Sequence, residues 1–157
     1  MKRLKFLLSG FFISPEFLSI IVAFGIGFSF ADQAVIVGNL IRGNSEAGKY
    51  LSGFIATLST SVFVLSSKIR SPQEKGTNKI LYEWPYYNLL LDRVYLSFFY
   101  AIFSGAASIV LLIAGTILSA KWIFILSACA LLTACSAALT VFLAHQKIRE
   151  ILEKYQK

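Results

Sequence analysis

Four apolar stretches, each about twenty residues long, follow one another along this chain and are separated by polar segments. They occupy about residues 17–38, 50–67, 94–118 and 122–144. At a helical rise of about 1.5 Å per residue, even the shortest stretch is roughly 27 Å long, close to the ~30 Å hydrocarbon thickness of a bilayer. The sequence therefore predicts an all-α integral membrane protein with four transmembrane helices.

The composition also separates this chain from soluble domains. Hydrophobic residues make up 57% of the chain and charged residues 15%, whereas soluble domains are about half apolar and about a quarter charged. The net charge of +7 comes from cations at the ends of the apolar stretches. Nucleic-acid-binding proteins instead gather cations on one face with interleaved aromatic residues. We therefore expect a lipid bilayer as partner and no direct nucleic acid binding.

Lysine and arginine are distributed unevenly between the two sides of the predicted membrane. If both termini are cytoplasmic, the inner segments hold twelve of these residues and the outer segments three. Because cytoplasmic segments of membrane proteins carry an excess of positive charge, this count predicts an inner-membrane, multi-pass protein with both termini in the cytoplasm.

The segments around the crossings have their own patterns. Residues 1–14 alternate basic and apolar residues as an interfacial amphipathic helix does, and Ser14, Pro15 and Glu16 then begin the helical domain 15–149. The loop 68–93 should be cytoplasmic. The tail 145–157 is amphipathic, and we expect it to lie on a surface or to self-associate. Aromatic residues near the interfaces are expected to anchor the protein: Tyr82, Trp84, Tyr86, Tyr87 and Trp122.

The second stretch, 50–67, carries seven serine and threonine residues. Helical spacing predicts a small, polar face made of Ser52, Ala56, Ser59, Thr60 and Ser66. The same spacing turns Phe54, Leu58, Val62 and Leu65 elsewhere. Such a face could line a pore or cavity, or it could form a seam between helices, because small hydroxyl residues let membrane helices approach closely.

Asp32 and Gln33 form an unusual polar pair near the outer end of the first stretch. A carboxylate within a membrane costs a few kcal/mol unless it faces water or a partner, so Asp32 is a candidate for attracting cations to a pathway. The alternative is an interfacial acid that lies about a turn below the membrane surface.

Catalytic and metal-binding motifs are absent from the sequence. There is no glycine-rich phosphate loop, no nucleophile elbow and no HExxH pair, and the eight acidic residues are scattered. His145 is the one histidine, and Cys129 and Cys135 are too far apart along a helix for a disulfide. We expect no enzyme activity, no metal site and no cofactor.

Two features suggest protein partners. Small residues recur at four-residue spacing at Ser104 and Ser108 and again at Ala130, Ala134 and Ala138, which predicts a symmetric homo-oligomer. Basic residues of the loop and tail are candidates for contact with a cytoplasmic effector protein: Lys68, Arg70, Lys75, Lys79 and Arg149.

The order of these parts, together with the segments SGFIA at 52–56 and FVLSSKIR at 63–70, resembles a group of small membrane proteins. They are the four-helix membrane proteins of bacterial antiphage systems, such as the membrane subunit of the Kiwa system and the membrane partner of the lambda Rex exclusion system. The resemblance implies a homo-oligomeric inner-membrane sensor or ion channel that works with a cytoplasmic partner in antiviral defence. It assigns no functional residue. The alternative is a non-conducting immunity or scaffold protein that binds another membrane protein.

Overall fold

The computed structural model describes residues 10, 12–70, 84–114 and 117–155. Almost all of these residues are helical, which confirms the all-α part of the predicted fold class for this part of the chain. The helices are α2 (Pro15–Ser29), α3 (Ala31–Gly43), α4 (Ser45–Arg70), α6 (Tyr87–Ala114) and α7 (Ala120–Tyr155). The amphipathic helix expected at 1–14 lies almost entirely outside the described residues.

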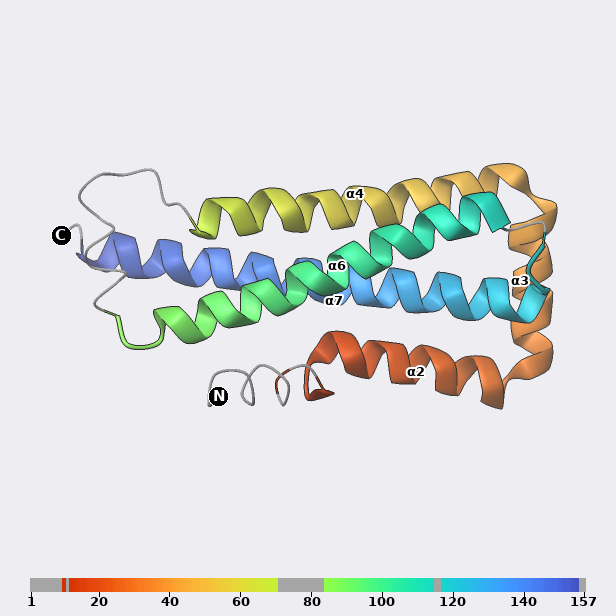
Figure 1. The fold of residues 1–157 in the computed structure, drawn as a ribbon, viewed down its shortest axis with the longest axis horizontal. Coiled ribbons are helices and arrows are strands. Elements are labelled where there is room, and N and C mark those ends of the chain that lie inside the picture. Colours follow the sequence, from red (N-terminus) through yellow and green to blue (C-terminus); the bar gives the residue numbers. More distant parts are fainter. Residues whose placement is uncertain (1–9, 11, 71–83, 115–116, 156–157) are drawn as a thin grey trace.

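Helix α7 is the centre of the bundle. It contacts α2, α3, α4 and α6, and it runs along the long axis of the molecule beside α4 and α6 (Figure 1). Helix α2 also follows this axis, while α3 crosses one end of the bundle almost at right angles to it. The small residues of α7 make this packing possible, because Ala130, Ala134 and Ala137 are buried against its neighbours.

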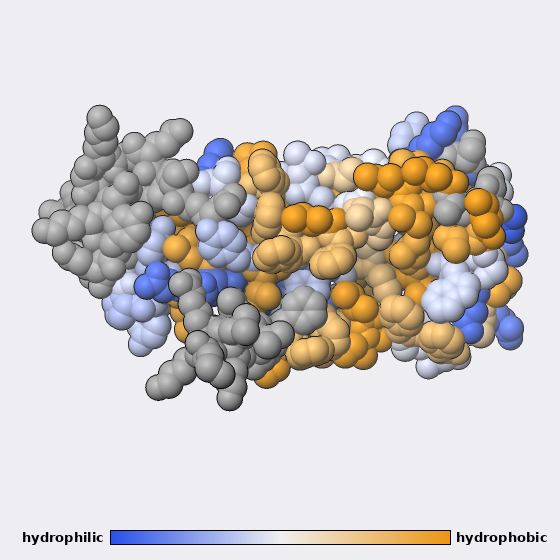
Figure 2. Space-filling view, viewed as in Figure 1, coloured by the Kyte–Doolittle hydropathy of each residue, from blue (hydrophilic) through white to orange (hydrophobic). Residues whose placement is uncertain are grey.

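The helices have the length and composition of membrane-spanning segments. Among the described residues, α4, α6 and α7 are each long and apolar enough to cross a membrane, and α2 and α3 together would provide a fourth, broken span. Figure 2 shows apolar residues across the middle of the molecule and hydrophilic residues towards its two ends. Large apolar side chains such as Ile113 and Leu40 lie on the outside, 75% and 66% exposed. These features are consistent with a multi-pass membrane protein.

The first crossing is not the continuous helix expected over 17–38. The chain bends by 104° between α2 and α3, and α2, with 15 residues, is only roughly 22 Å long. The backbone remains hydrogen-bonded on both sides of the bend, since the Phe30 amide donates to the Ile26 carbonyl at 2.9 Å and the Phe30 carbonyl accepts from Ala34 at 2.9 Å.

Close packing holds α3 across the end of the bundle. Ala34 and Gly38, one turn apart on α3, are both buried, and Gly38 lies against Ala120, the first residue of α7. A side chain at Gly38 would collide with the backbone of Ala120. The bend therefore depends on small residues that allow α3 to cross α7 at backbone contact.

The segment 39–49 between the first two predicted crossings is also almost entirely helical. Helix α3 continues to Gly43 and α4 begins at Ser45, so Asn44 alone separates them. The Asn44 side-chain oxygen accepts the amides of Glu46 at 3.1 Å and Ala47 at 3.2 Å. Because the first amides of a helix have no partner within it, this cap allows α4 to start well before the apolar stretch.

The third and fourth predicted crossings are both longer than expected, at the ends predicted to be cytoplasmic. Helix α6 begins at Tyr87, within the predicted loop, and α7 continues through the predicted tail to Tyr155. Ile148 is buried, and Ile151 and Leu152 pack against the core cluster that contains it. The apolar side of the tail, expected to lie on a surface or to self-associate, therefore packs at least partly within the chain.

The small residues predicted to join copies of the protein are used inside one chain instead. Ser104, Ser108, Ala130 and Ala134 are all nearly inaccessible, and the Ser104 hydroxyl donates to the Ala130 carbonyl at 2.6 Å. These residues let α6 and α7 approach each other. They therefore give no support to the predicted oligomer.

Candidate functional site

The hydroxyl residues of α4 lie on two different faces. Ser52 and Ser66 are buried, and Ser59 is half-buried with a buried hydroxyl. They alternate at three- and four-residue spacing with Ile55, Val62 and Ile69, which are also buried. Thr60 is exposed. The prediction that Ser52, Ser59, Thr60 and Ser66 share a face away from Val62 is therefore wrong, because apolar residues fill the gaps in the inner seam and Thr60 turns about 100° away from Ser59.

The inner hydroxyls act as small packing residues. Ser59 faces Gly105 of α6, where an added Cβ would lie 3.7 Å from the serine Cβ, and Ser66 donates to the Phe63 carbonyl of its own helix at 2.9 Å. Ile55 lies between Ser52 and Ser59, and Val62 lies between Ser59 and Ser66; both apolar side chains are fully buried. Their side chains interrupt any polar path along this seam within one copy.

The second face of α4 points away from the bundle. We call Gly53, Ala56, Thr57, Thr60 and Ser61 the outer hydroxyl face. All five are exposed, and most of them line a shallow hollow on the surface of α4. Each hydroxyl donates to a carbonyl one turn earlier: Thr57 to Gly53 at 2.8 Å, Thr60 to Ala56 at 2.8 Å and Ser61 to Thr57 at 2.9 Å. The face therefore needs neither water nor a protein partner to satisfy these donors.

Large apolar side chains surround this face. Phe54 and Phe63 project from its two flanks and are 54% and 53% exposed. Helix α7 likewise presents Leu139 and Phe142 on its outer side. The outer hydroxyl face is thus a strip of small residues on a surface that is otherwise covered by bulky ones.

Asp32 and Gln33 do not belong to the same site. Both are exposed on the first turn of α3, at the end that joins α2, and α4 begins about thirteen residues later, roughly 20 Å along the helix. An acid in the first turn is favoured by the helix dipole. The structure therefore does not bring the Asp32 carboxylate together with the α4 hydroxyls.

A buried ion pair that the sequence analysis missed joins the start of α2 to α6. Glu16 is completely buried, and Arg93 forms a salt bridge with it. The Ser97 hydroxyl donates to the second oxygen of this carboxylate at 2.7 Å. Next to the pair, the hydroxyls of Ser14 and Tyr100 are hydrogen-bonded to each other. This network ties the beginning of the first crossing to the third.

The sequence does carry a signal for this pair. Its pattern predicts Ser14 as the cap of a helix, and the Ser14 hydroxyl indeed accepts the Phe17 amide at 3.0 Å. The same pattern places Glu16 only in the first turn, and it places Arg93 only among the loop charges. A contact is indicated by two features. Glu16 and Arg93 have opposite charges at the same end of two predicted crossings, and Ser97 follows Arg93 by one turn.

The candidate partner-binding and anchoring residues have mixed outcomes. Lys68 is exposed, and Arg149 is exposed and paired with Glu153 at 2.8 Å. Tyr87 is no interfacial anchor, because it is buried and its hydroxyl donates to the Ile69 carbonyl at 3.3 Å. Among the other anchoring candidates, Tyr86 is exposed and Trp84 is half-buried, and Trp122 packs against Phe24 and Phe28. The remaining candidates lie outside the described residues: Lys75, Lys79, Tyr82 and the Arg70 side chain.

Neither metal chemistry nor homology supplies a further assignment. The described residues contain no group of three or more potential metal ligands, and Cys129 and Cys135 are free thiols. Comparisons with protein families, with curated proteins and with solved structures find no match to this chain.

Proposed function

We propose that this protein is a homo-oligomeric component of the bacterial inner membrane, that its copies meet along the outer hydroxyl face of α4, and that it senses a disturbance in antiphage defence. The observation that carries the proposal is the strip of small, internally hydrogen-bonded residues in the middle of an apolar helix surface. The predicted positive-inside topology and the resemblance of 52–56 and 63–70 to antiphage membrane proteins support the cellular setting.

In lipid, helices associate through faces that can pack closely. The hydrophobic effect does not drive two membrane helices together, since lipid tails are as apolar as leucine, and close packing between small residues decides which faces associate. On α4 such residues recur at Gly53, Thr57 and Ser61, one turn apart. Phe54 and Phe63 on the flanks would close the contact at its edges.

The hydrogen bonds of this face favour a dry seam over a water-filled channel. Thr57, Thr60 and Ser61 already donate to their own helix, so a second copy of α4 can cover them without leaving a donor unpaired. A change in packing at such a seam could be relayed to a soluble partner through the exposed charges of α7 beyond His145. Ion conduction along the same hydroxyls is the second candidate function.

Single cysteines test the proposed contact. In a background with Cys129→Ala and Cys135→Ala, Thr60→Cys should form disulfide-linked dimers on mild oxidation in membranes. The matched control is Leu139→Cys on the outer side of α7, which is 59% exposed and should remain monomeric. Equal cross-linking at both positions, or none at Thr60, would remove the basis for an α4 interface.

Two further measurements separate the candidate functions. Thr57→Leu should lower the mass of the detergent-solubilised oligomer and abolish protection against phage together, if assembly is required for sensing. Conduction predicts that Thr60→Cys reacts with a small water-soluble thiol reagent, because the thiolate forms only where water reaches it. A mass shift without any effect on phage plating would favour the immunity or scaffold alternative.

A further inference from the structure

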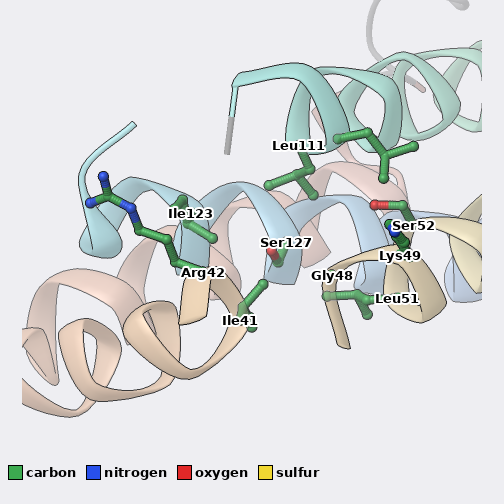
Figure 3. A pocket seen from close by; sticks show the side chains of 10 residues that line it. Ile41, Arg42, Gly48, Lys49, Leu51, Ser52, Leu111, Ile123 and Ser127 are labelled. Carbon is green, nitrogen blue, oxygen red and sulfur yellow. The ribbon is translucent and has the colours of Figure 1, made fainter. Parts of the chain in front are cut away.

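A cavity of about 190 Å³ lies at the end of the bundle that α3 crosses. Residues of α3, α4, α6 and α7 line it, and Figure 3 shows their side chains. The lining residues are Ile41 and Arg42 of α3, Gly48, Lys49, Leu51 and Ser52 of α4, Leu111 and Leu112 of α6, and Ile123 and Ser127 of α7. This site is separate from the outer hydroxyl face, and its assignment does not depend on the proposed function.

Two buried hydroxyls belong to this cavity. Ser127 is only 4% exposed, and its oxygen has no hydrogen-bond partner in the part of the chain that the structure describes. Ser52, 2% exposed, lies across from it on α4 (Figure 3). Because a buried polar group without a partner is unfavourable, the Ser127 hydroxyl points to a ligand that supplies an acceptor.

The charged part of the lining is entirely positive. Lys49 is exposed at the mouth, and Arg42 lines the cavity from α3 while its guanidinium group extends towards the start of α7 (Figure 3). Among the described residues, the lining includes no carboxylate. Such a site attracts an anion, and the hydroxyl and ammonium groups are donors suited to its oxygens.

The rest of the lining is aliphatic, including Leu51, Leu111 and Leu112. A free inorganic anion would leave these side chains without a partner, whereas an amphiphile would satisfy both halves of the site. We propose that the cavity binds the phosphate head group of an anionic membrane lipid. The phosphate accepts from Lys49 and Ser127, and the start of an acyl chain lies along the leucines.

Lipid titration of the purified, delipidated full-length protein tests this assignment. Phosphatidylglycerol should raise the thermal unfolding temperature in detergent at lower concentration than phosphatidylcholine with the same acyl chains. Lys49→Gln should weaken apparent binding of phosphatidylglycerol about fivefold, the effect expected for one cation near an anionic lipid, and leave phosphatidylcholine unchanged. Ser127→Leu, which fills the cavity, should remove the preference.

The controls keep the result decisive. Lys147→Gln removes an exposed cation from the distant part of α7 and should retain the lipid preference. Lys49 is exposed, so its replacement tests the site even if Ser127→Leu does not fold. Equal stabilisation by both lipids, or an unchanged preference in Lys49→Gln, would overturn the proposal. Stabilisation by inorganic phosphate alone to the same extent would show that the site takes a soluble anion and not a lipid.

Discussion

Replacing Arg93 with glutamine should destabilise the protein more than replacing its partner Glu16 with glutamine. The two groups differ in burial, because the Glu16 side chain is 0% exposed and the Arg93 side chain 27% exposed. Loss of Arg93 leaves a buried carboxylate with only the Ser97 hydroxyl as donor. Breaking a buried pair in this way costs about 3–5 kcal/mol.

The Glu16→Gln variant has a way to relax that the Arg93→Gln variant lacks. Its amide oxygen still accepts from Ser97, and the guanidinium of Arg93 is partly open to its surroundings and can turn outwards. The expected loss is about 1–2 kcal/mol, the cost of one weakened hydrogen bond to a charged group. The order of the two single variants therefore follows from burial and not from the contact itself.

The measurement is the free energy of unfolding in detergent for the two single variants and for Glu16→Gln combined with Arg93→Gln. The double variant should lose less than the sum of the single losses, because it leaves no uncompensated charge. The exposed pair Arg149 and Glu153 is the matched control, and the corresponding Gln variants should change stability little. Equal single losses, or additive losses at Glu16 and Arg93, would refute the reasoning.

Three other outcomes are expected. Gly38→Ala should destabilise by about 1–3 kcal/mol, because its Cβ would meet the α7 backbone, whereas Gly25→Ala, with nothing within 4 Å, should be neutral or stabilising in thermal unfolding. Thr133→Val should leave the stability unchanged or raise it, because the buried Thr133 hydroxyl has no hydrogen-bond partner among the described residues. Ser104→Ala should lower the stability by about 0.6 kcal/mol, because it loses the hydrogen bond to the Ala130 carbonyl. A topology reporter at Asn44 should score periplasmic and one after the C-terminus cytoplasmic; the reverse result would contradict the positive-inside assignment.

Hydrophobicity predicted the helices well because each one buries or exposes apolar residues over its whole length. It could not predict the bend at Phe30, since the bend depends on a contact between Gly38 and the α7 backbone that is remote in the sequence. It likewise placed the start of α4 too late, because that start depends on the Asn44 side chain. Helix existence is a local property, whereas these two boundaries are set by single contacts.

The α4 hydroxyls show a second limit of sequence patterns. Ser52, Ser59 and Ser66 recur every seven residues, and Ile55 and Val62 lie between them on the same side of α4. Thr57 and Thr60 lie on the outer side. Both strips are small and polar, so composition could not decide which one faces the bundle. The neighbouring helix determines which strip faces the bundle, because Gly105 of α6 leaves room for Ser59 of the inner strip.

Helix α2 packs along α7 with Ala23 fully buried, and the ion pair ties its start to α6. This arrangement predicts how the Arg93→Gln variant fails. Between the ion pair at its start and the bend at its end, an apolar cavity of about 200 Å³ opens between α2, α6 and α7. The Cys129 thiol lines this cavity, 4.0 Å from the Ile20 carbonyl of α2. Cys129 is half-buried, so release of the start of α2 should make its thiol more accessible before the bundle unfolds.

The rate at which Cys129 reacts with a maleimide in detergent measures this release in a Cys135→Ala background. Arg93→Gln should raise the rate without denaturant, and Glu16→Gln should raise it less, in the same order as their losses of stability. If Cys129 reacts only at denaturant concentrations that unfold the whole protein, α2 is not an independently opening unit. In that case the ion pair stabilises the entire bundle, and α2 does not open by itself.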